Sequence, residues 1–182
     1  SFSAQARHFN YMEIEDVNYY NVPTPLTDLY FKTVFSQGQN LDAFFTVNTS
    51  KEFNFSIAYK GMRSLGNYQN ALTSSGNFRF TTNYQTKNGK YVMRAHITMQ
   101  DLLNQENGGI TDADVQRFIS GAEEIKDRSV FDPNFENAEN TLEGKRFHLE
   151  QVYNLLTKKD SVNTLGLSIT NTISFQDKFY EY

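Results

Sequence analysis

The stretch from Asn77 to Gln100 constrains the fold most, because its pattern is that of a β-hairpin with one apolar and one polar face. Residues 77–85 and 91–100 each alternate apolar with polar side chains, and strand side chains point alternately to opposite faces. Between them lies Thr86-Lys87-Asn88-Gly89, and Asn-Gly is a strong hairpin signal because both residues tolerate a positive φ. Arginine and histidine side chains fall in mid-strand on the polar face. The pattern therefore predicts a sheet with a wet polar face and a wide, aromatic apolar face.

The composition narrows the class of protein further. With 17 Lys and Arg against 21 Asp and Glu, the net charge of −4 and the lack of a basic cluster argue against nucleic acid as a partner. There are 16 Phe and 11 Tyr but no cysteine, which excludes disulfides and thiolate chemistry within these residues. The longest apolar runs are too short for a transmembrane helix, and the start of the chain shows no signal-peptide pattern.

Seven segments show the two-residue period of β-strands. They are residues 28–35, 40–48, 52–60, 77–85, 91–100, 146–155 and 164–175. All three prolines lie outside them, as a sheet requires. Residues 1–27 alternate poorly, and we expect an irregular N-terminal segment there, followed by a β-barrel portion over residues 28–182.

The lengths of the connections indicate the kind of sheet. From the second strand onward, short links alternate with long ones, and the longest is an acidic loop over residues 101–144. Strands of about 9–11 residues joined in this way are typical of an outer-membrane barrel with short periplasmic turns and long extracellular loops. We therefore predict an all-β, antiparallel, up-and-down transmembrane β-barrel, present here in part as about seven strands. A soluble β-sandwich or a lipocalin-like barrel would also alternate.

Aromatic residues near the strand ends support this interpretation, because aromatic rings favour membrane–water interfaces. Three tyrosines lie beside the short turns, and the other predicted interface rings lie beside the long loops. The predicted lipid-interface aromatics are Tyr59, Phe78, Tyr84, Tyr91, Phe147, Tyr153 and Phe175.

Four stretches carry a resemblance to a known family. They are residues 22–30 (VPTPLTDLY), 37–43 (QGQNLDA), 59–70 (YKGMRSLGNYQN) and 100–109 (QDLLNQENGG). From about Ala6 onward, the chain resembles the putative-porin family of Bacteroidota outer membranes. The resemblance implies an outer-membrane β-barrel whose family members are far longer, so that these residues would be an N-terminal portion. It implies a location and an architecture, and it brings no catalytic or binding residues.

An open sheet of seven strands would leave unpaired backbone groups in lipid, at a cost of several kcal/mol per group. The expected partners are therefore outer-membrane lipid and the strands that close the barrel, supplied by the remainder of the protein or by another outer-membrane protein chain. An eight-stranded closure is conceivable if residues 1–27 or 176–182 form one more strand.

The acidic loop holds eleven acidic residues against three basic ones, a net charge of −8, so the rest of the chain carries +4. Within it, Thr111 followed by Asp112 and Asp114 predicts a helix start, and Gly121 predicts the end of a helix of about ten residues. A solvated extracellular loop is the simplest interpretation.

A sharper hypothesis sets this loop against the polar face of the strands. The candidate pore-lining residues on that face are Lys60, Arg79, Arg94, His96, Arg146 and His148. The candidate loop acids are Asp112, Asp114, Glu123 and Glu124. Basic wall and acidic loop would together set a transverse field that selects solutes by charge. The alternative hypothesis is that the arginines pair with Glu150 or Asp42 of neighbouring strands inside a plugged barrel.

Three classes of function stand, and none of them is an enzyme. The first is a porin for passive or weakly selective diffusion, the second a structural or secretion-associated barrel that binds protein partners, and the third a soluble β-domain that binds carbohydrate or lipid. A histidine–serine hydrolase pair is the weakest alternative. The spacing of the three histidines predicts no metal site, and we expect no cofactor.

Overall fold

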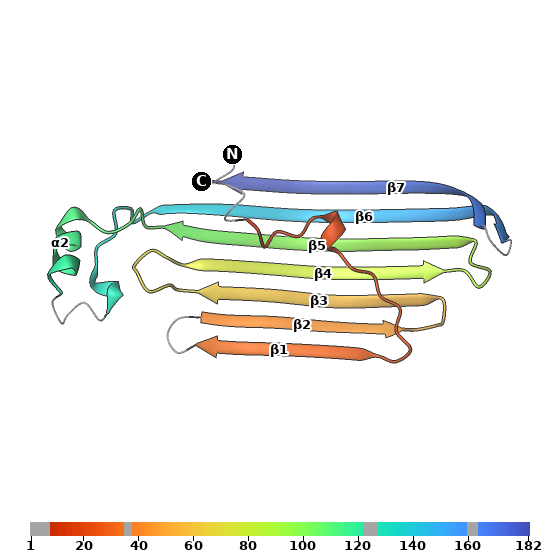
Figure 1. Cartoon of the computed structure of the whole chain (residues 1–182), viewed down its shortest axis with the longest axis horizontal. Helices are drawn as coiled ribbons and strands as arrows, with labels where there is room; N and C mark the ends of the chain where they lie inside the picture. Colours follow the sequence, from red (N-terminus) through yellow and green to blue (C-terminus); the bar gives the residue numbers. More distant parts are fainter. Residues whose placement is uncertain (1–7, 35–37, 122–126, 160–163) are drawn as a thin grey trace.

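The computed structural model describes residues 8–34, 38–121, 127–159 and 164–182, most of which form one antiparallel sheet (Figure 1). Seven strands lie side by side in chain order, which confirms the predicted all-β, up-and-down arrangement. The strands are β1 (Leu26–Val34), β2 (Gly38–Asn48), β3 (Phe53–Ser64), β4 (Thr73–Gln85), β5 (Tyr91–Glu106), β6 (Ala138–Lys159) and β7 (Thr164–Glu181). In the described residues the sheet is open, with β1 and β7 at its two edges.

The strands are longer on the loop side than the alternation predicts. β5 continues to Glu106 and β6 begins at Ala138, so residues 101–106 and 138–144 are strand, and the connection shrinks to residues 107–137. The same correction applies to β3 and β4, which reach Ser64 and Thr73, and to β7, which includes most of the residues after 175. Alternation marks a strand only where one face is apolar, whereas backbone pairing continues through polar side chains.

In the β4–β5 turn, only one of the two residues of the Asn-Gly pair has a positive φ. Gly89 has a φ of 66°, and its backbone N–H donates to the Thr86 carbonyl at 2.8 Å. Asn88 is not at positive φ, and its side chain instead accepts a hydrogen bond from the Lys90 backbone N–H at 3.0 Å. The hairpin is confirmed, but only the glycine uses the left-handed region.

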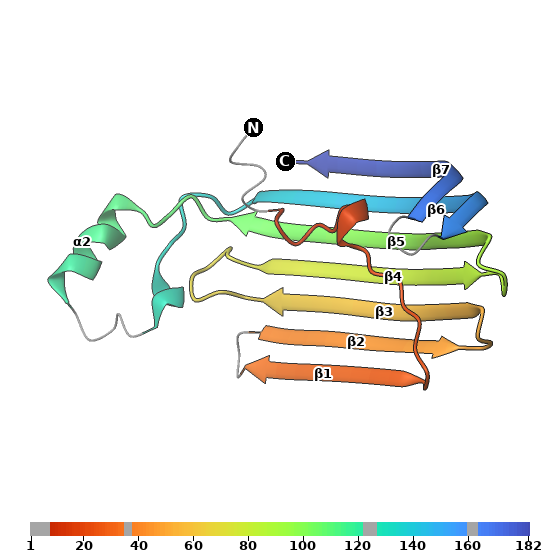
Figure 2. The same ribbon diagram turned by 45° about the vertical axis from the view of Figure 1, so that its right-hand side comes forward.

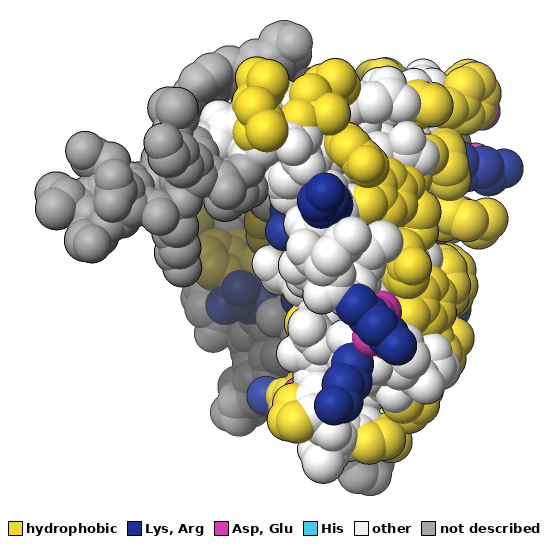
Figure 3. Space-filling model, turned by 90° about the vertical axis from the view of Figure 1, so that its right-hand side faces the viewer, with side chains coloured by type: hydrophobic (Ala, Val, Ile, Leu, Met, Phe, Trp, Pro, Cys, Tyr) yellow, Lys and Arg dark blue, Asp and Glu magenta, His cyan; other side chains and the backbone are white. Residues whose placement is uncertain are grey.

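Burial in this sheet is the reverse of burial in a water-soluble one. The side chains buried to less than 2 % exposure are mostly polar or charged, and they include Arg146, His96 and Thr98. The apolar face is exposed: Ile57, Ile173 and Phe175 are 42 %, 50 % and 69 % exposed. Seen from the end of the sheet, hydrophobic side chains gather along one side (Figure 3).

Part of the polar face is covered by the N-terminal residues, which cross the sheet obliquely in front of β6 to β2 (Figures 1 and 2). Residues 8–25 contain one short 3-10 helix, η1 (Ile14–Asp16), and no strand, so they supply no eighth strand; β1 begins at Leu26, two residues before the predicted start of the strands. Tyr11 lies buried against Leu102 and Leu142 of β5 and β6. We call residues 8–22 the N-terminal strap.

The predicted helix is α2 (Asp112–Ser120), and its ends are those expected. The Thr111 side chain accepts a hydrogen bond from the backbone N–H of Asp114, and Gly121 ends the helix in the left-handed conformation. α2 lies beyond the ends of the strands (Figure 1). A second short 3-10 helix, η3 (Arg128–Val130), follows in the same loop.

No helix within the described ranges has the length and apolar character needed to cross a membrane.

Candidate functional site

The six side chains predicted to line a pore all lie on the polar face of the sheet. The register shows this directly, because residues paired across neighbouring strands share a face. His96 is opposite His148, Thr98 is opposite Arg146, and Arg79 is opposite Thr98. Arg94 and Lys60 have the same parity on β5 and β3. The sequence therefore placed the six residues on one face, and the strap covers part of that face.

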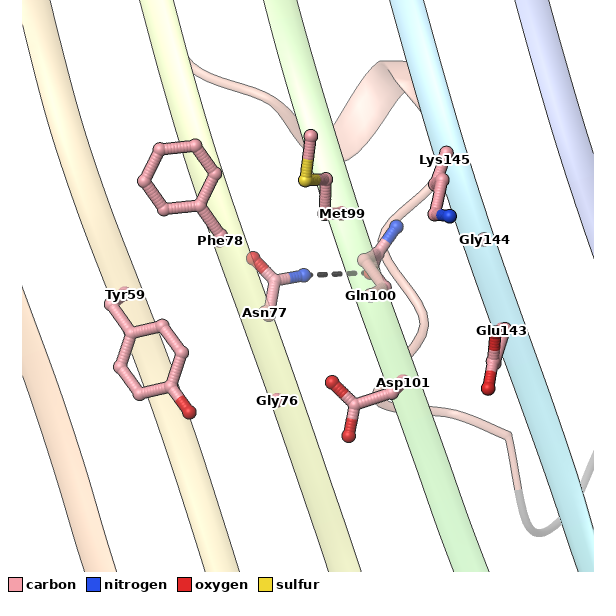
Figure 4. Close-up of a pocket in the computed structure, with 10 residues that line it drawn as sticks. All are labelled: Tyr59, Gly76, Asn77, Phe78, Met99, Gln100, Asp101, Glu143, Gly144 and Lys145. Atoms are coloured by element: carbon pink, nitrogen blue, oxygen red, sulfur yellow. Dashed lines mark hydrogen bonds between the residues drawn. The ribbon is translucent and has the colours of Figure 1, made fainter.

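Gln100 of β5 holds the first part of the strap through a two-way contact. The Met12 backbone N–H donates to Gln100 Oε1 at 2.8 Å, and Gln100 Nε2 donates to the Met12 carbonyl at 2.9 Å. The Asn77 side chain also donates to Gln100 Oε1, at 2.6 Å, which fixes the orientation of the amide (Figure 4). The sheet thus presents a donor and an acceptor to the backbone of one strap residue, Met12.

Arg146 is the most deeply buried charge at this site, with its side chain fully covered. Its Nη2 donates to the Met12 carbonyl at 2.8 Å and to Glu13 Oε2 at 3.2 Å. Glu13 also pairs with Lys178 of β7, at 3.1 Å. A buried cation in mid-strand is stable only with such partners. The strap supplies them to Nη2, whereas Nε and Nη1 make no hydrogen bond to any described residue.

Gly144 of β6 makes room for the ring of Tyr11. A Cβ placed on this glycine would lie 2.7 Å from Tyr11 Cε2 and 2.8 Å from Cζ, closer than such atoms approach. The ring therefore lies directly on the backbone of β6, with the Arg146 guanidinium 5.9 Å and Lys178 Nζ 4.0 Å from its centroid. Cations near an aromatic face are favourable, so the ring ties two strands to the strap.

His96 and His148 are stacked on the wall beneath the second part of the strap. Their ring centroids are 5.0 Å apart with an interplanar angle of 21°, and the residues are 1 % and 7 % exposed. Tyr19 Oη lies 2.8 Å from His96 Nδ1. Burial, followed by the negative charge of Glu150, raises the pKa of Tyr19 to about 12, so its hydroxyl remains protonated at neutral pH.

The remaining cations of this face differ in how the strap touches them. Arg79 Nη1 lies 2.9 Å from the sulfur of Met12. Arg94 pairs with Glu150 at 3.4 Å and lies 6.0 Å from the centroid of Tyr19, which matches the expected pairing of an arginine with Glu150. Lys60, near the loop-side end of β3, is exposed.

The aromatic residues predicted for the membrane interfaces all lie on the exposed, apolar face. Phe78 is opposite Met99, Tyr91 is opposite Tyr153, and Phe147 is opposite Phe175. Tyr59 is 43 % exposed, and the ring centroids of Tyr84 and Tyr91 are 6.2 Å apart beside the β4–β5 turn. Their predicted contact with lipid stays a prediction.

A cavity of about 290 Å³ lies where the side chains of this face change from apolar to charged (Figure 4). Tyr59, Phe78 and Met99 line one part of it. The next outward-facing residues along β5 and β6 are charged, and Asp101, Glu143 and Lys145 line another part of the cavity. The exposed face thus passes from an apolar band to a charged one within one step of the strand alternation.

The described part of the acidic loop contacts the β3–β4 connection instead of the polar face. The Gln69 side chain donates to the Ser129 carbonyl, and Arg128 donates to the Tyr68 hydroxyl. Phe131, 1 % exposed, stacks on Tyr68. These contacts fold the loop back on its own end of the sheet.

Of the four candidate loop acids, Asp112 and Asp114 belong to α2, whereas Glu123 and Glu124 lie outside the described residues. Asp114 makes its hydrogen bonds within the loop itself. The Asp132 backbone N–H and the Arg117 guanidinium, at 2.8 Å and 2.7 Å, hold the pKa of this carboxyl below its usual range.

Within the described ranges, no group of three or more His, Cys, Asp or Glu side chains has the arrangement of a metal site.

Sequence reasoning missed the strap residues that complete this site. Tyr11, Met12, Glu13 and Tyr19 lie in a segment without periodicity, and nothing local marks them as partners of the sheet. Two signals were present. Cations in mid-strand need counter-charges, and an isolated glycine in a strand, such as Gly144, often marks the close approach of another group.

Comparison with known proteins adds one positive result. Searches of curated proteins and of solved structures found no match. A family model described as "Putative porin" matches residues 1–182. The chain therefore belongs to the putative-porin family, as its resemblance predicted.

Proposed function

We propose that this protein is an outer-membrane β-barrel of porin type, which lets small solutes diffuse passively or with weak selectivity. The inverted sheet carries the proposal: its aromatic face is exposed, while the most deeply buried side chains of the sheet lie on its polar and charged face. In water, an exposed apolar face of this size is unfavourable, because burial is worth roughly 25 cal/mol per Å² of apolar surface. In a bilayer the same face is solvated by hydrocarbon. Membership of the porin family supports the assignment.

The dimensions of the apolar band also support a membrane span. On β5, the band runs from Tyr91, beside the turn, to Met99, after which Asp101 begins the charged region. These nine residues match the lower end of the 9–11 that a tilted strand needs to cross a bilayer. Beyond Met99, the β5–β6 hairpin continues into what we propose is the extracellular space.

Lipid contact also requires that the edges of the sheet be paired. β1 and β7 leave unpaired backbone groups along their outer sides in the described residues. In hydrocarbon each such group costs several kcal/mol, so a spanning sheet must close. We propose that further strands, from the same polypeptide or from a second chain, complete the barrel and enclose the polar face as the wall of a lumen.

The basic groups of that wall would bias the solutes that pass. We expect Arg79, Arg94 and Arg146 to favour anions, because cationic side chains in a narrow pore raise the local concentration of anions. The test is ion selectivity of the complete polypeptide in planar bilayers. Replacing all three arginines by alanine should reduce the preference for anions.

Lys145→Ala is the matched control, since it removes a cation from the outward face and should leave selectivity unchanged. Unchanged selectivity in the triple variant would refute a role for the arginine wall. A complete polypeptide that forms no channel would refute the porin assignment itself.

One observation favours the second candidate, a structural or secretion-associated barrel. The strap occupies part of the polar face, and the β5–β6 hairpin carries α2 well beyond the other strand ends (Figure 2). A lumen blocked by the strap, together with a projecting hairpin, is what we expect of a barrel that binds protein partners outside the cell. Conductance separates the two candidates, because the second predicts none.

A further inference from the structure

We propose that the N-terminal strap is a releasable constriction of the pore, and that protonation of the stacked His96–His148 pair loosens it. The proposal rests on the porin assignment above. It has two parts: the strap narrows the lumen when it is docked on the wall, and uptake of a proton by the pair favours the undocked state.

The strap is attached in a way that permits release. Within the described residues, the backbone–backbone hydrogen bonds of the strap are local turns, such as that from the Val17 N–H to the Ile14 carbonyl. Every hydrogen bond between the strap and the described part of the sheet involves at least one side chain. At the far end, the Val22 N–H donates to Asn48 Oδ1 at 3.1 Å, and Asn48 Nδ2 donates to Asn21 Oδ1 at 2.6 Å. The strap can therefore leave while the sheet retains every strand-to-strand bond.

The strap also lies where it would narrow a lumen. It crosses the polar face from β6 to β2, and it buries Arg146, His96 and Thr98 to 2 % exposure or less. If the polar face is the inner wall, the volume of the strap is subtracted from the open cross-section. Undocking would return those wall groups to water.

The histidine pair is poorly placed to accept a charge while the strap is docked. His96 faces His148 on the neighbouring strand, and the next rung on the same face holds Arg146 opposite Thr98. His96 Nε2 and His148 Nδ1 are buried and make no hydrogen bond to any described residue. An imidazolium here would be a buried charge beside a buried arginine, which is unfavourable unless it is hydrated or paired.

The neighbouring charged groups do not neutralise such an imidazolium. From the strap, Glu13 faces the wall, but Arg146 and Lys178 both bind it. From β6, Glu150 pairs with Arg94 of β5. The four cations and two carboxylates around the pair are Arg79, Arg94, Arg146, Lys178, Glu13 and Glu150. Tyr19 of the strap also faces the pair, and it stays protonated and neutral at neutral pH.

The sign of the pH effect follows from this arrangement. Because the docked state disfavours the imidazolium and the undocked state hydrates it, the undocked state binds the proton more tightly. Lowering the pH from about 8 to about 5 should therefore shift the strap toward release, since histidine titrates in that range. One linked proton gives at most about a tenfold change in the release equilibrium per pH unit.

The experiment uses the complete polypeptide. These 182 residues contain no cysteine, so an engineered cysteine pair can lock the strap without a competing thiol among them. Asn21→Cys with Asn48→Cys joins two side chains that are in contact at 2.6 Å. Single-channel conductance is recorded across the pH range, before and after reduction. We expect low, pH-independent conductance when the disulfide is formed, and conductance that rises as the pH falls once it is reduced.

Two histidine variants locate the sensor. His96→Gln combined with His148→Gln should abolish the pH response. His8→Gln is the matched control: His8 also belongs to the strap and packs on Tyr180, with ring centroids 5.4 Å apart, yet it lies outside the pair. Loss of the response in His8→Gln alone, or its survival in the double variant, would overturn the assignment to the pair.

A second measurement keeps this proposal separate from the porin assignment. Hydrogen exchange of the Met12 amide, which donates to Gln100, reports strap docking without any channel. Faster exchange at lower pH supports release, and pH-independent docking refutes it. A conducting protein whose conductance ignores both the lock and the pH would refute the constriction while leaving the porin assignment intact.

Discussion

Gly144→Ala is the smallest change that tests how the strap docks. The added methyl group would lie less than 3 Å from the ring of Tyr11, so either the ring or the backbone of β6 must move. Overpacking of this kind costs about 1–3 kcal/mol, which corresponds to a shift of about 5- to 150-fold in the docking equilibrium. The ring is the movable partner, because β6 is paired on both sides. The cost should therefore appear as strap release and leave the sheet in place.

The assay is hydrogen exchange of the complete polypeptide in detergent, read on the peptide that contains Tyr11, Met12 and Val17. In Gly144→Ala, exchange in that peptide should accelerate by the stated factor, while the amides of β5 and β6 keep their protection. Gly166→Ala is the matched control, since a methyl group there would meet the Leu156 carbonyl oxygen at an ordinary 3.6 Å. Unchanged exchange in the strap, or acceleration as large in the control, would refute the close packing of Tyr11 on Gly144.

Three further predictions concern other parts of the chain. Ile173→Arg should reduce membrane insertion, at a cost of about 2–4 kcal/mol for a lipid-facing arginine at mid-bilayer, whereas Thr172→Arg on the opposite face should not; equal folding yields in lipid vesicles would contradict this. Because Asp114 has a lowered pKa, its contribution to loop stability is full above about pH 4 and falls as the pH drops through its folded pKa. Asp114→Asn should therefore increase proteolysis of residues 111–132 at neutral pH, and Asp112→Asn, at an exposed position, should not. Gly89→Ala should destabilise the β4–β5 turn by about 1–2 kcal/mol through its φ of 66° alone, measured as a lower denaturation midpoint; no shift would show that the turn rearranges.

Strand assignment succeeded where one face of a strand is apolar. The alternation at Phe78–Tyr84 and Tyr91–Met99 reports contact with an apolar environment, so it gave the strands and the shared face of the aromatic residues. It stopped at Gln100 because the outward face becomes charged at Asp101, although pairing continues to Glu106. Helix α2 was predictable to its caps, since capping depends on residues adjacent in the sequence.

The candidate site, too, has features that the sequence could predict and features that it could not. The face on which a strand side chain lies follows from a period of two, so the sequence alone could place Arg94, His96 and Arg146 on one face together with Lys60 and Arg79. The stacking of His96 on His148 needed the relative register of β5 and β6, which a connection of some thirty residues does not specify. The pairing of Arg146 with Glu13 spans 133 residues and has no local signature.

The sequence by itself determined the two-faced strands, their order, the hairpin turn and the capped helix, because each of these depends on interactions between residues that are near in the chain. Only the tertiary structure decided what covers each face. The strap lies on the polar wall because buried Arg146 and Gln100 offer partners that its backbone and Glu13 can satisfy, while the aromatic face is left exposed. Which face is covered depends on contacts between residues far apart in the chain, and no local sequence pattern reports those contacts.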